Sequence, residues 1–323
     1  MAISISADEG LTVGFDIGGT NTRAGVVTAA GEIIASASVR SPESADDMVG
    51  AIVSLVDELK ADHDIKAVGV AIAGFLDPEC EIVRFAPHLP WRGNAPVRKI
   101  LHDALGLPVR LEHDANAAAW GEYRFGVAQD TDTWVFFALG TGIGATLMHR
   151  GEIFRGAFGT APEFGHITVV PSGRPCSCGK RGCLERYASG TALVDTAQEL
   201  AHQRSFEDTR LYRRVVEKRV TGDDIMTAAR NGDRLALAAL ASFSQWLGQG
   251  LSVVADILDP ELIVIGGGVS RDADLFLEDA REHMSSSIVG AGFRPLPRVI
   301  RAELGAQAGM IGVADLARQR IEE

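Results

Sequence analysis

The sequence has no long hydrophobic run and no readable targeting signal. No apolar stretch reaches the roughly 18 residues that a membrane-spanning helix needs. The first residues, MAISISADEGLTVGF, contain no basic segment followed by a long apolar one, as a secretory signal would. We therefore expect a cytoplasmic protein under reducing conditions, without a membrane partner.

Positive charge is also scarce. The chain has 31 Lys and Arg against 43 Asp and Glu, which gives a formal net charge of −12. Because phosphate backbones are bound by clustered Lys and Arg, this balance argues against nucleic acid as a partner. It does not exclude a nucleotide, which a glycine loop and one metal ion can hold. The acidic excess by itself favours solubility rather than a binding role.

Cysteine is rare but clustered. Three of the four cysteines, Cys176, Cys178 and Cys183, lie within eight residues. A disulfide is disfavoured, because no secretory signal is present and the clustered thiols are odd in number. With His166 ten residues upstream, they form the Cys3His donor set of a closed tetrahedral zinc site. Cys80 is remote in sequence and is expected in the core.

Two acids flank this predicted zinc loop. Glu163 precedes His166 and Glu185 follows the last cysteine, while Gly179 and Gly182 provide tight turns between the thiols. A metal that fixes His166 also fixes two nearby carboxylates that can hydrogen-bond a polyhydroxyl ligand. The loop therefore predicts a structural zinc ion that also shapes a sugar pocket.

Strand and helix patterns alternate along the chain, which predicts an α/β protein. A length of 323 residues is roughly twice the usual domain size, so two packed lobes are expected. Ser44 and Asp47 have the spacing of a capping box at the start of the first helix. The expected elements are three strands in 11–39, a helix in 44–63, a strand at 67–74, a helix at 95–105, a strand and an alanine-rich helix in 107–126, strands in 133–154, helices from 191 to 258, a strand from 261, a strand near 298 and a helix from about 306.

A strand, a glycine turn and a second strand occur twice, in TVGFDIGGTNTRAGVV and in TWVFFALGTGIGATLM. The repeat predicts two related lobes, each with a turn that grips phosphate in a shared cleft. Glycine lets backbone amides approach anionic oxygens closely. Asp16, just before the first turn, is placed to hold a magnesium ion through water.

A single Gly-Gly hairpin is more often only a turn, but the second copy favours a clamp on a polyphosphate chain. The third glycine run, IGGG, either lets a flat base lie on bare backbone or serves strand-to-helix packing. The candidate nucleotide-binding residues beside Asp16 are Gly18, Gly19, Thr20, Asn21, Gly140, Thr141, Gly142, Gly144, Gly266, Gly267 and Gly268.

Asp114 stands at a strand-to-helix turn in EHDANAAAWGE. One interpretation is an N-cap that accepts hydrogen bonds from the free amides of the helix. The other is a general base that takes a proton from an attacking hydroxyl. The motif alone leaves both open.

Taken in order, the motifs DIGGT, HDANAAAWGE, LGTGIG, EFGH, CSCGKRGCLE and IGGG resemble the ROK family of sugar kinases and repressors. The resemblance covers 11 to about 317, and FAPHLPWR, YASG and GMIGVADLAR are most similar to the family's bacterial glucokinases. It implies a two-lobed, actin-like (sugar kinase/actin) ATPase fold with a duplicated β-meander and helix core. The implied lobes are 1–125, with a helix at about 305–323 packing back on it, and 126–304, with the zinc loop and dimerisation helices.

The resemblance also implies residue roles. Asp114 would deprotonate the 6-hydroxyl of a hexose, and His113, Glu163, His166 and Glu185 would contact the sugar. Both glycine turns would hold the phosphates of ATP with Mg2+. The family suggests a homodimer or homotetramer.

The sequence departs from the family pattern beside the base. His113 and His88 stand where the family commonly has Asn, so glucose, N-acetylglucosamine, mannose and fructose stay open as substrates. Polyphosphate stays open as a donor, although the sequence has no cluster of basic residues that would form the long basic track expected for it. A sugar-sensing regulator is the alternative from another class. It is disfavoured, because the residues before Leu11 are too few for a DNA-binding domain.

Overall fold

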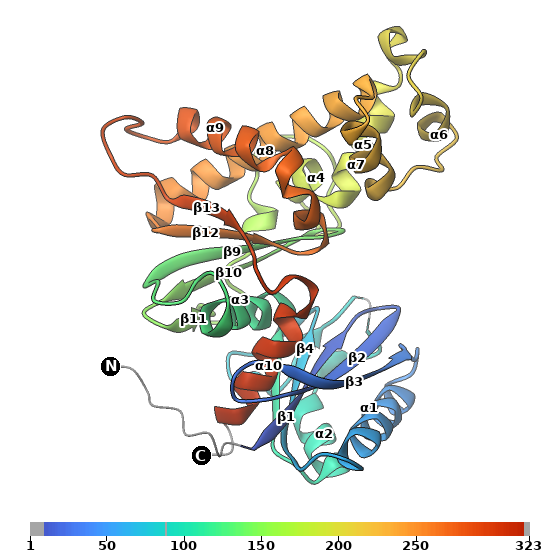
Figure 1. Ribbon diagram of the computed structural model, residues 1–323, viewed down its shortest axis with the longest axis vertical. Coiled ribbons are helices and arrows are strands. Elements are labelled where there is room, and N and C mark those ends of the chain that lie inside the picture. The colour runs from blue at the N-terminus through green and yellow to red at the C-terminus, as the bar shows by residue number, and fades with distance from the viewer. Residues whose placement is uncertain (1–9, 88, 320–323) are drawn as a thin grey trace. The chain divides into compact units, whose positions relative to one another are not determined.

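The computed structural model describes residues 10–87 and 89–319 (Figure 1). Within them the chain forms two compact units. The first unit comprises the described residues of Met1–Asp132, with Thr146–Pro162 and the described residues of Ala306–Glu323. The second unit comprises Thr133–Ala145 and Glu163–Gly305. His88 lies outside the described residues, so its part in sugar choice stays a prediction.

The first unit contains a five-stranded sheet in the order β3-β2-β1-β4-β8. Its first three strands form the predicted antiparallel meander, and β4 and β8 run parallel to β1. The strands are β1 Leu11–Ile17, β2 Asn21–Val27, β3 Ile33–Arg40, β4 Ile65–Ile72 and β8 Val109–His113. A small sheet of β5 Phe75–Leu76, β6 Val83–Phe85 and β7 Arg92–Ala95 accompanies it.

The second five-stranded sheet repeats the first. Its order is β11-β10-β9-β12-β13, the same meander followed by two parallel strands. Its strands are β9 Thr133–Leu139, β10 Ile143–His149, β11 Glu152–Phe154, β12 Leu262–Gly266 and β13 Arg298–Arg301. Strands β1 and β9 even share one burial pattern, with four consecutive buried residues. The predicted duplication is confirmed.

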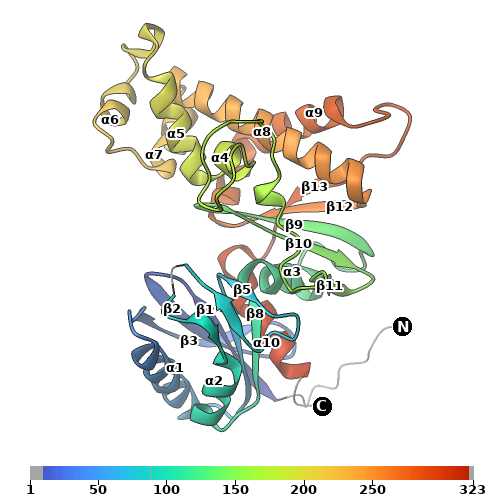
Figure 2. The ribbon, with the colours of Figure 1, turned by 180° about the vertical axis from the view of Figure 1, so that it is seen from behind.

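Four helices belong to the first unit: α1 Ala45–Lys60, α2 Val97–Leu105, α3 Asp114–Phe125 and α10 Ala308–Arg318. On one face of the sheet, Phe15 and its alternate neighbours pack in one apolar core with the buried stripe of α1 and with α2. Figure 2 shows these two helices together beside that sheet. The predicted cap is present, because Ser44 accepts from the Asp47 amide at 3.1 Å. The reciprocal bond differs from a capping box, since the Ser44 hydroxyl itself donates to the Asp47 carboxylate.

The opposite face of this sheet carries a row of glycines under α10. Gly25, Gly14 and Gly69 face one another across β2, β1 and β4. A Cβ on Gly14 would overlap the carbonyl oxygen of Met310, and one on Gly69 would overlap that of Val313. This glycine row therefore lets the backbone of α10 lie directly on the sheet (Figure 1).

The second unit places its helices along one side of β9, β12 and β13 (Figure 1). They are α4 Glu185–Ala188, α5 Gly190–Leu200, α6 Tyr212–Val216, α7 Gly222–Arg230, α8 Arg234–Leu258 and α9 Leu277–Ser287. The longest, α8, is capped by Asp233, which accepts from the Leu235 and Ala236 amides. Short 3-10 turns include η1 Phe164–His166 and η3 Gly268–Leu275.

Most predicted elements are confirmed, with small shifts at their ends. The helix expected from 95 begins at Val97, because Pro96 serves as its N-cap. The C-terminal helix begins at Ala308, after a 3-10 turn at Gly305–Gln307. Among the described helices, none combines the length and apolar character needed to cross a membrane.

The glycine row makes a testable prediction. Gly69→Ala should lower the free energy of unfolding by about 3 kcal/mol, because its methyl group meets helix backbone that cannot rotate away. Gly50→Ala is the matched control, since Gly50 lies in α1 with open space around its Cα. That control should raise stability by about 0.5–1 kcal/mol. Equal effects of both changes in urea unfolding would contradict the packing argument.

Candidate active site

In the first unit, three parallel strands end at one edge of the sheet. The register pairs Ile17 of β1 with Ile72 of β4, and Ile72 with His113 of β8. Carboxyl ends of neighbouring parallel strands are where open α/β sheets bind ligands. This carboxyl edge holds Asp16, the next-to-last residue of β1, and Asp114, which directly follows β8.

Asp114 is the first residue of α3 and not its N-cap. The cap position is taken by His113, whose side chain makes no capping bond. Asp114 Oδ1 accepts from the amide of Ala115 at 2.7 Å and lies 3.3 Å from His113 Nε2. The N-cap interpretation is therefore wrong. The Asp114 side chain is 46% exposed, so its carboxylate is accessible to a ligand.

Asp16 lies in the electrostatic field of Asp114. Burial raises the pKa of Asp16, the negative charge of Asp114 raises it further, and Arg23 partly opposes both effects. Arg23 is the cross-strand partner of Asp16 in β2. Two carboxylates whose charges repel at one sheet edge would both be stabilised by a bound cation.

The first glycine turn is braced by a residue that sequence reasoning missed. The Gly18 amide donates to the carbonyl of Asn21 at 3.0 Å. The Ser41 hydroxyl donates to the Gly18 carbonyl at 2.6 Å, and the Ser41 amide to the Thr20 carbonyl at 2.9 Å. Gly19, Thr20 and Asn21 themselves remain exposed. A serine directly after β3, beside Pro42, was the available signal.

A cavity of about 270 Å3 opens beside this turn. Its lining includes two of the predicted phosphate-binding residues, Gly19 and Thr20, together with Arg40, Ser41 and Arg92. Two guanidinium groups next to exposed turn amides give this cavity a character suited to anionic oxygens.

In the second unit, the second glycine turn is tied to the segment that follows the cysteines. The Gly140 amide donates to the Gly142 carbonyl at 2.9 Å. Glu185 Oε2 accepts from the Ile143 amide at 3.0 Å, and a Cβ on Gly142 would overlap that same carboxylate. Gly190, which begins α5, donates its amide to the Gly140 carbonyl at 2.8 Å. Gly144 is part of β10.

The three glycines of IGGG have different surroundings. A Cβ on Gly266 would overlap the ring of Phe136, and one on Gly267 would overlap the carbonyl oxygen of Leu139. These two glycines therefore serve packing between β12 and β9. Gly268, the first residue of η3, has open space around its Cα and is the member of the run that can approach a ligand.

The structure brings the four predicted zinc ligands together. One ligand atom from each of His166, Cys176, Cys178 and Cys183 lies within 4.8 Å of all the others. Gly179 and Gly182 both adopt positive φ, as expected for the tight turns between the thiols. We call these four ligand residues the cysteine cluster. All four cysteines are free thiols in the structure.

The spacing within the cysteine cluster fits a tetrahedral ion. A zinc ion with Zn–S of about 2.3 Å and Zn–N of about 2.0 Å has S···S edges of about 3.8 Å and S···N edges of about 3.5 Å. The Cys178 and Cys183 sulfurs are 3.7 Å apart, and the Cys176 sulfur is 3.6 Å from His166 Nδ1. The donor set and its dimensions both fit zinc.

The two ring nitrogens of His166 face different partners. Nδ1 lies toward the cysteine cluster, whereas Nε2 lies 3.8 Å from a carboxylate oxygen of Glu163. Glu185 Oε1 is 3.9 Å from the Cys176 sulfur, while its other oxygen holds the second glycine turn. The acids predicted beside the zinc loop are therefore placed next to it.

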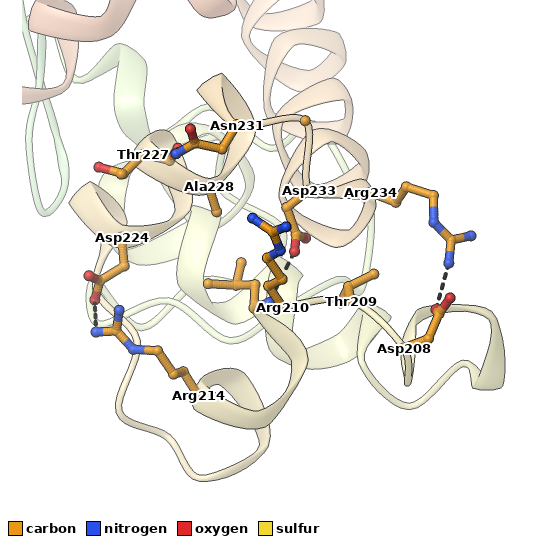
Figure 3. Close-up of a pocket in the computed structure, with 12 residues that line it drawn as sticks. Asp208, Thr209, Arg210, Arg214, Asp224, Thr227, Ala228, Asn231, Asp233 and Arg234 are labelled. Carbon is orange, nitrogen blue, oxygen red and sulfur yellow. Dashed lines mark hydrogen bonds and ion pairs between the residues drawn. The ribbon is translucent and has the colours of Figure 1, made fainter.

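A larger cavity lies elsewhere in the second unit. It measures about 610 Å3 and is bordered by α6, α7 and the start of α8 (Figure 3). It contains none of the predicted site residues. Its charges largely satisfy one another, with Arg214 on Asp224 at 2.7 Å and Arg234 on Asp208 at 2.5 Å. We therefore do not assign the active site to this cavity.

Comparison with known proteins adds an independent finding. The sequence matches the ROK family over residues 12–320. It is 40% identical to a glucokinase of Streptomyces coelicolor over 96% of this chain and 98% of that protein. It is 34% identical to a glucokinase of Halalkalibacterium halodurans over 95% of each chain.

A solved structure agrees with these relatives. The ROK family glucokinase of Streptomyces griseus, in complex with glucose and AMPPNP, superposes with a TM-score of 0.85 and 42% identity. The match covers 96% of this chain and 100% of that one. The protein therefore belongs to the ROK family and has its sugar-kinase fold.

Burial and the negative charge of Asp114 predict that ionised Asp16 lowers the stability of the fold. A folded-state pKa above the unfolded value means that ionised Asp16 costs stability once the pH rises through the folded value. Asp16→Asn should raise the melting midpoint of the metal-free protein at pH 7 by about 1–3 °C. The gain should shrink as the pH falls below about 4, because Asp16 then becomes protonated in both states. Asp57→Asn, on the exposed side of α1, should leave the midpoint unchanged.

Proposed function

We propose that the protein is an ATP-dependent glucokinase that transfers the γ-phosphoryl group to the 6-hydroxyl of glucose. The observation that carries this proposal is the near-complete match to a ROK glucokinase that binds glucose and AMPPNP. The glucokinase of Streptomyces coelicolor, matched over nearly all of both chains, supports the same reaction. The site residues support it chemically.

Asp114 is proposed as the base that accepts the proton of the sugar hydroxyl. An unperturbed aspartate has a pKa near 3.9 and is a weak base at neutral pH. Phosphoryl transfer proceeds through a loose transition state, in which the hydroxyl proton is lost late. The main task of Asp114 is thus to orient the attacking oxygen, which suits a carboxylate held by its own helix start.

Sugar hydroxyls are proposed to meet Glu163, His166 and Glu185, with His113 as a further contact. The Nε2 atom of His166 lies beside the Glu163 carboxylate, while its Nδ1 atom faces the sulfur of Cys176. A carboxylate and a ring nitrogen at this spacing can accept from and donate to neighbouring hydroxyls of one pyranose. A histidine at 113 offers a ring nitrogen in place of the amide that the family commonly has.

ATP phosphates are proposed to lie on the two glycine turns, at Gly18–Thr20 and at Gly140–Gly142. The Gly18 and Gly140 amides already donate within their turns, so the remaining amides of the two turns are proposed to donate to phosphate oxygens. Asp16 is placed to hold Mg2+ through water, which would also relieve its repulsion with Asp114. When bound, Mg2+ supplies charge neutralisation on the transferred phosphoryl group.

Zinc is proposed as a structural ion held by the cysteine cluster. When bound, it supplies a closed tetrahedral anchor for the loop. Because His166 is both ligand and sugar contact, the anchor fixes the ring that faces Glu163. Because Glu185 lies against Cys176 and holds the Ile143 amide, the same loop also supports the second glycine turn.

Other expectations remain predictions. They are a cytoplasmic location, a homodimer or homotetramer, the absence of nucleic-acid and membrane partners, and the lobe boundaries near residues 125 and 305. N-acetylglucosamine, mannose and fructose remain alternative substrates, and polyphosphate an alternative donor. A non-catalytic sugar-sensing regulator remains the alternative class.

The proposal is tested by sugar-dependent ADP release from Mg-ATP with glucose, N-acetylglucosamine, mannose and fructose. Glucose should be preferred, and Asp114→Asn should lower kcat by about 10²–10⁴-fold, the usual share of a general base. Glucose affinity of Asp114→Asn, measured by calorimetry, should stay within about twofold because the side chain keeps its shape.

Each other outcome has a distinct meaning. Preference for another hexose would keep the kinase reaction but reject glucose as the substrate. A fall of less than about tenfold in Asp114→Asn would reject that residue as the base. Glucose binding without ADP release would favour the regulator.

The zinc proposal predicts a coupled loss. Cys178→Ser should lose the bound zinc, lower the melting midpoint and abolish glucose binding together, because one tetrahedral ion holds the ring of His166. Zinc is measured by elemental analysis of the purified protein. Cys80→Ala removes a cysteine outside the cluster and should keep the full zinc content. A zinc-free Cys178→Ser protein with full activity would contradict the proposal.

A further inference from the structure

A fully buried carboxylate lies directly behind the turn that carries Asp114. Glu112 is the fourth residue of β8, and its side chain is 1% exposed. Sequence reasoning did not single it out, since an acid in a short strand reads as a solvent-facing position. A charge at this depth requires several partners.

Both oxygens of Glu112 are surrounded by donors. Oε2 accepts from Arg110 at 3.0 Å and from Arg155 in a short ion pair. Oε1 accepts from the Asn116 side-chain amide at 3.0 Å and from the His113 main-chain amide at 3.2 Å. We call these five residues the Glu112 network.

The Asn116 side chain is itself held in one orientation. Its Oδ1 accepts from the hydroxyl of Thr146 in β10 at 2.9 Å, which leaves its NH2 group for Glu112. Glu112 therefore bonds to the residue before Asp114 and to the second residue after it. One carboxylate thus forms hydrogen bonds on both sides of the turn that orients Asp114.

Arg155 extends the network to a second functional segment. It follows β11, and its carbonyl accepts from the amide of Ala161 at 3.2 Å, which closes the loop between them. Pro162 and Glu163 come directly after this loop in the chain. The Arg155–Glu112 pair thus connects the turn of the proposed base with the segment that leads to a proposed sugar contact.

Stability is a poor explanation for such a network. Moving two charges out of water costs about as much as their attraction returns, so a buried ion pair is weak evidence for stability. The guanidinium groups of Arg155 and Arg110 outweigh the burial and hold the pKa of Glu112 below its usual value. Glu112 is therefore ionised at neutral pH, and its bonds to the turn are charge-assisted and directional.

We propose that Glu112 is a positioning residue: it fixes the Asp114 turn and, through Arg155, the segment that leads to Glu163. This inference rests on the proposed phosphoryl transfer for its kinetic consequence, but not for its structural one. Glu112 does not touch substrate. Its effect is exerted on the direction in which Asp114 meets the attacking hydroxyl.

The first unit provides a matched control of a buried carboxylate with an Arg partner and an NH donor. Asp315 accepts from Arg318 at 3.0 Å and from the ring nitrogen of Trp120 at 2.8 Å. Arg318 also reaches Thr12 at the start of β1, the end of that strand opposite to Asp16. This second network joins α10 to Trp120 and Arg124 of α3, and none of its partners lies within 112–117.

The test compares Glu112→Gln with Asp315→Asn in the full chain, assayed well below their melting midpoints. Glu112→Gln should lower kcat on the order of 100-fold, as expected for a base displaced by about 1 Å. Its KM for ATP should change by less than about twofold. Asp315→Asn should lower the melting midpoint while leaving kcat unchanged. Equal kcat in wild type and Glu112→Gln would overturn the proposal.

A double-mutant cycle separates positioning from general damage. If Glu112 acts through Asp114, then Glu112→Gln should have almost no further effect on kcat in an Asp114→Asn background. An unchanged 100-fold loss in that background would mean that Glu112 acts elsewhere. Arg155→Lys keeps the positive charge but loses the planar guanidinium that pairs with Glu112, so it should lower kcat by less than Glu112→Gln does. This variant replaces Glu112→Gln in the test if Glu112→Gln does not fold.

Hydrogen exchange gives a readout that does not depend on activity. Amides of 113–117 should exchange faster in Glu112→Gln than in wild type, and should not change in Asp315→Asn. An inactive wild type would reject the proposed function. The exchange measurement would still decide whether Glu112 positions the Asp114 turn. Unchanged exchange at 113–117 would overturn the inference even in an active enzyme.

Discussion

The close contact between the backbone of α10 and the central sheet underlies the organisation of the first unit. It requires three glycines in register on β2, β1 and β4, because a side chain at Gly14 or Gly69 would occupy the space of a helix carbonyl. The same helix also packs against α3 without side chains between them, since a Cβ on Gly312 would overlap the carbonyl oxygen of Ala117. One helix thus holds both the strand that ends near Asp16 and the helix that begins with Asp114.

In the second unit, a single carboxylate has a comparable role. Glu185 bonds to the Ile143 amide with one oxygen and lies against the Cys176 sulfur with the other. The turn proposed for phosphate and the loop proposed for zinc therefore share a residue. Local order in one is expected to depend on the other, so the proposed zinc ion would also support the turn proposed for phosphate.

Charge distribution gives the two proposed carboxylates different environments. Glu112 is buried and paired with two guanidinium groups, so it stays ionised and acts on its neighbours through hydrogen bonds. Asp114 is half exposed and is held by the Ala115 amide, so it is free to meet a hydroxyl. Two acids separated by one residue can have different roles because β8 ends between them, so Glu112 lies in the strand and Asp114 begins α3.

The sequence by itself determined the repeated meander, the helix capped by Ser44, the Cys3His set and the membership implied by its ordered motifs. These features are local: each depends on spacing within a few residues, such as glycine turns, cap positions and cysteine intervals. Tertiary structure alone decided that Asp114 is not an N-cap, that Ser41 braces the first turn, that Gly266 and Gly267 serve packing, and that Glu112 is buried. For Ser41, Gly266, Gly267 and the Arg155–Glu112 pair, the partners come from other elements, tens of residues away. Local spacing cannot encode which of those elements will pack together, because that choice is made by the burial of the whole sheet and its helices.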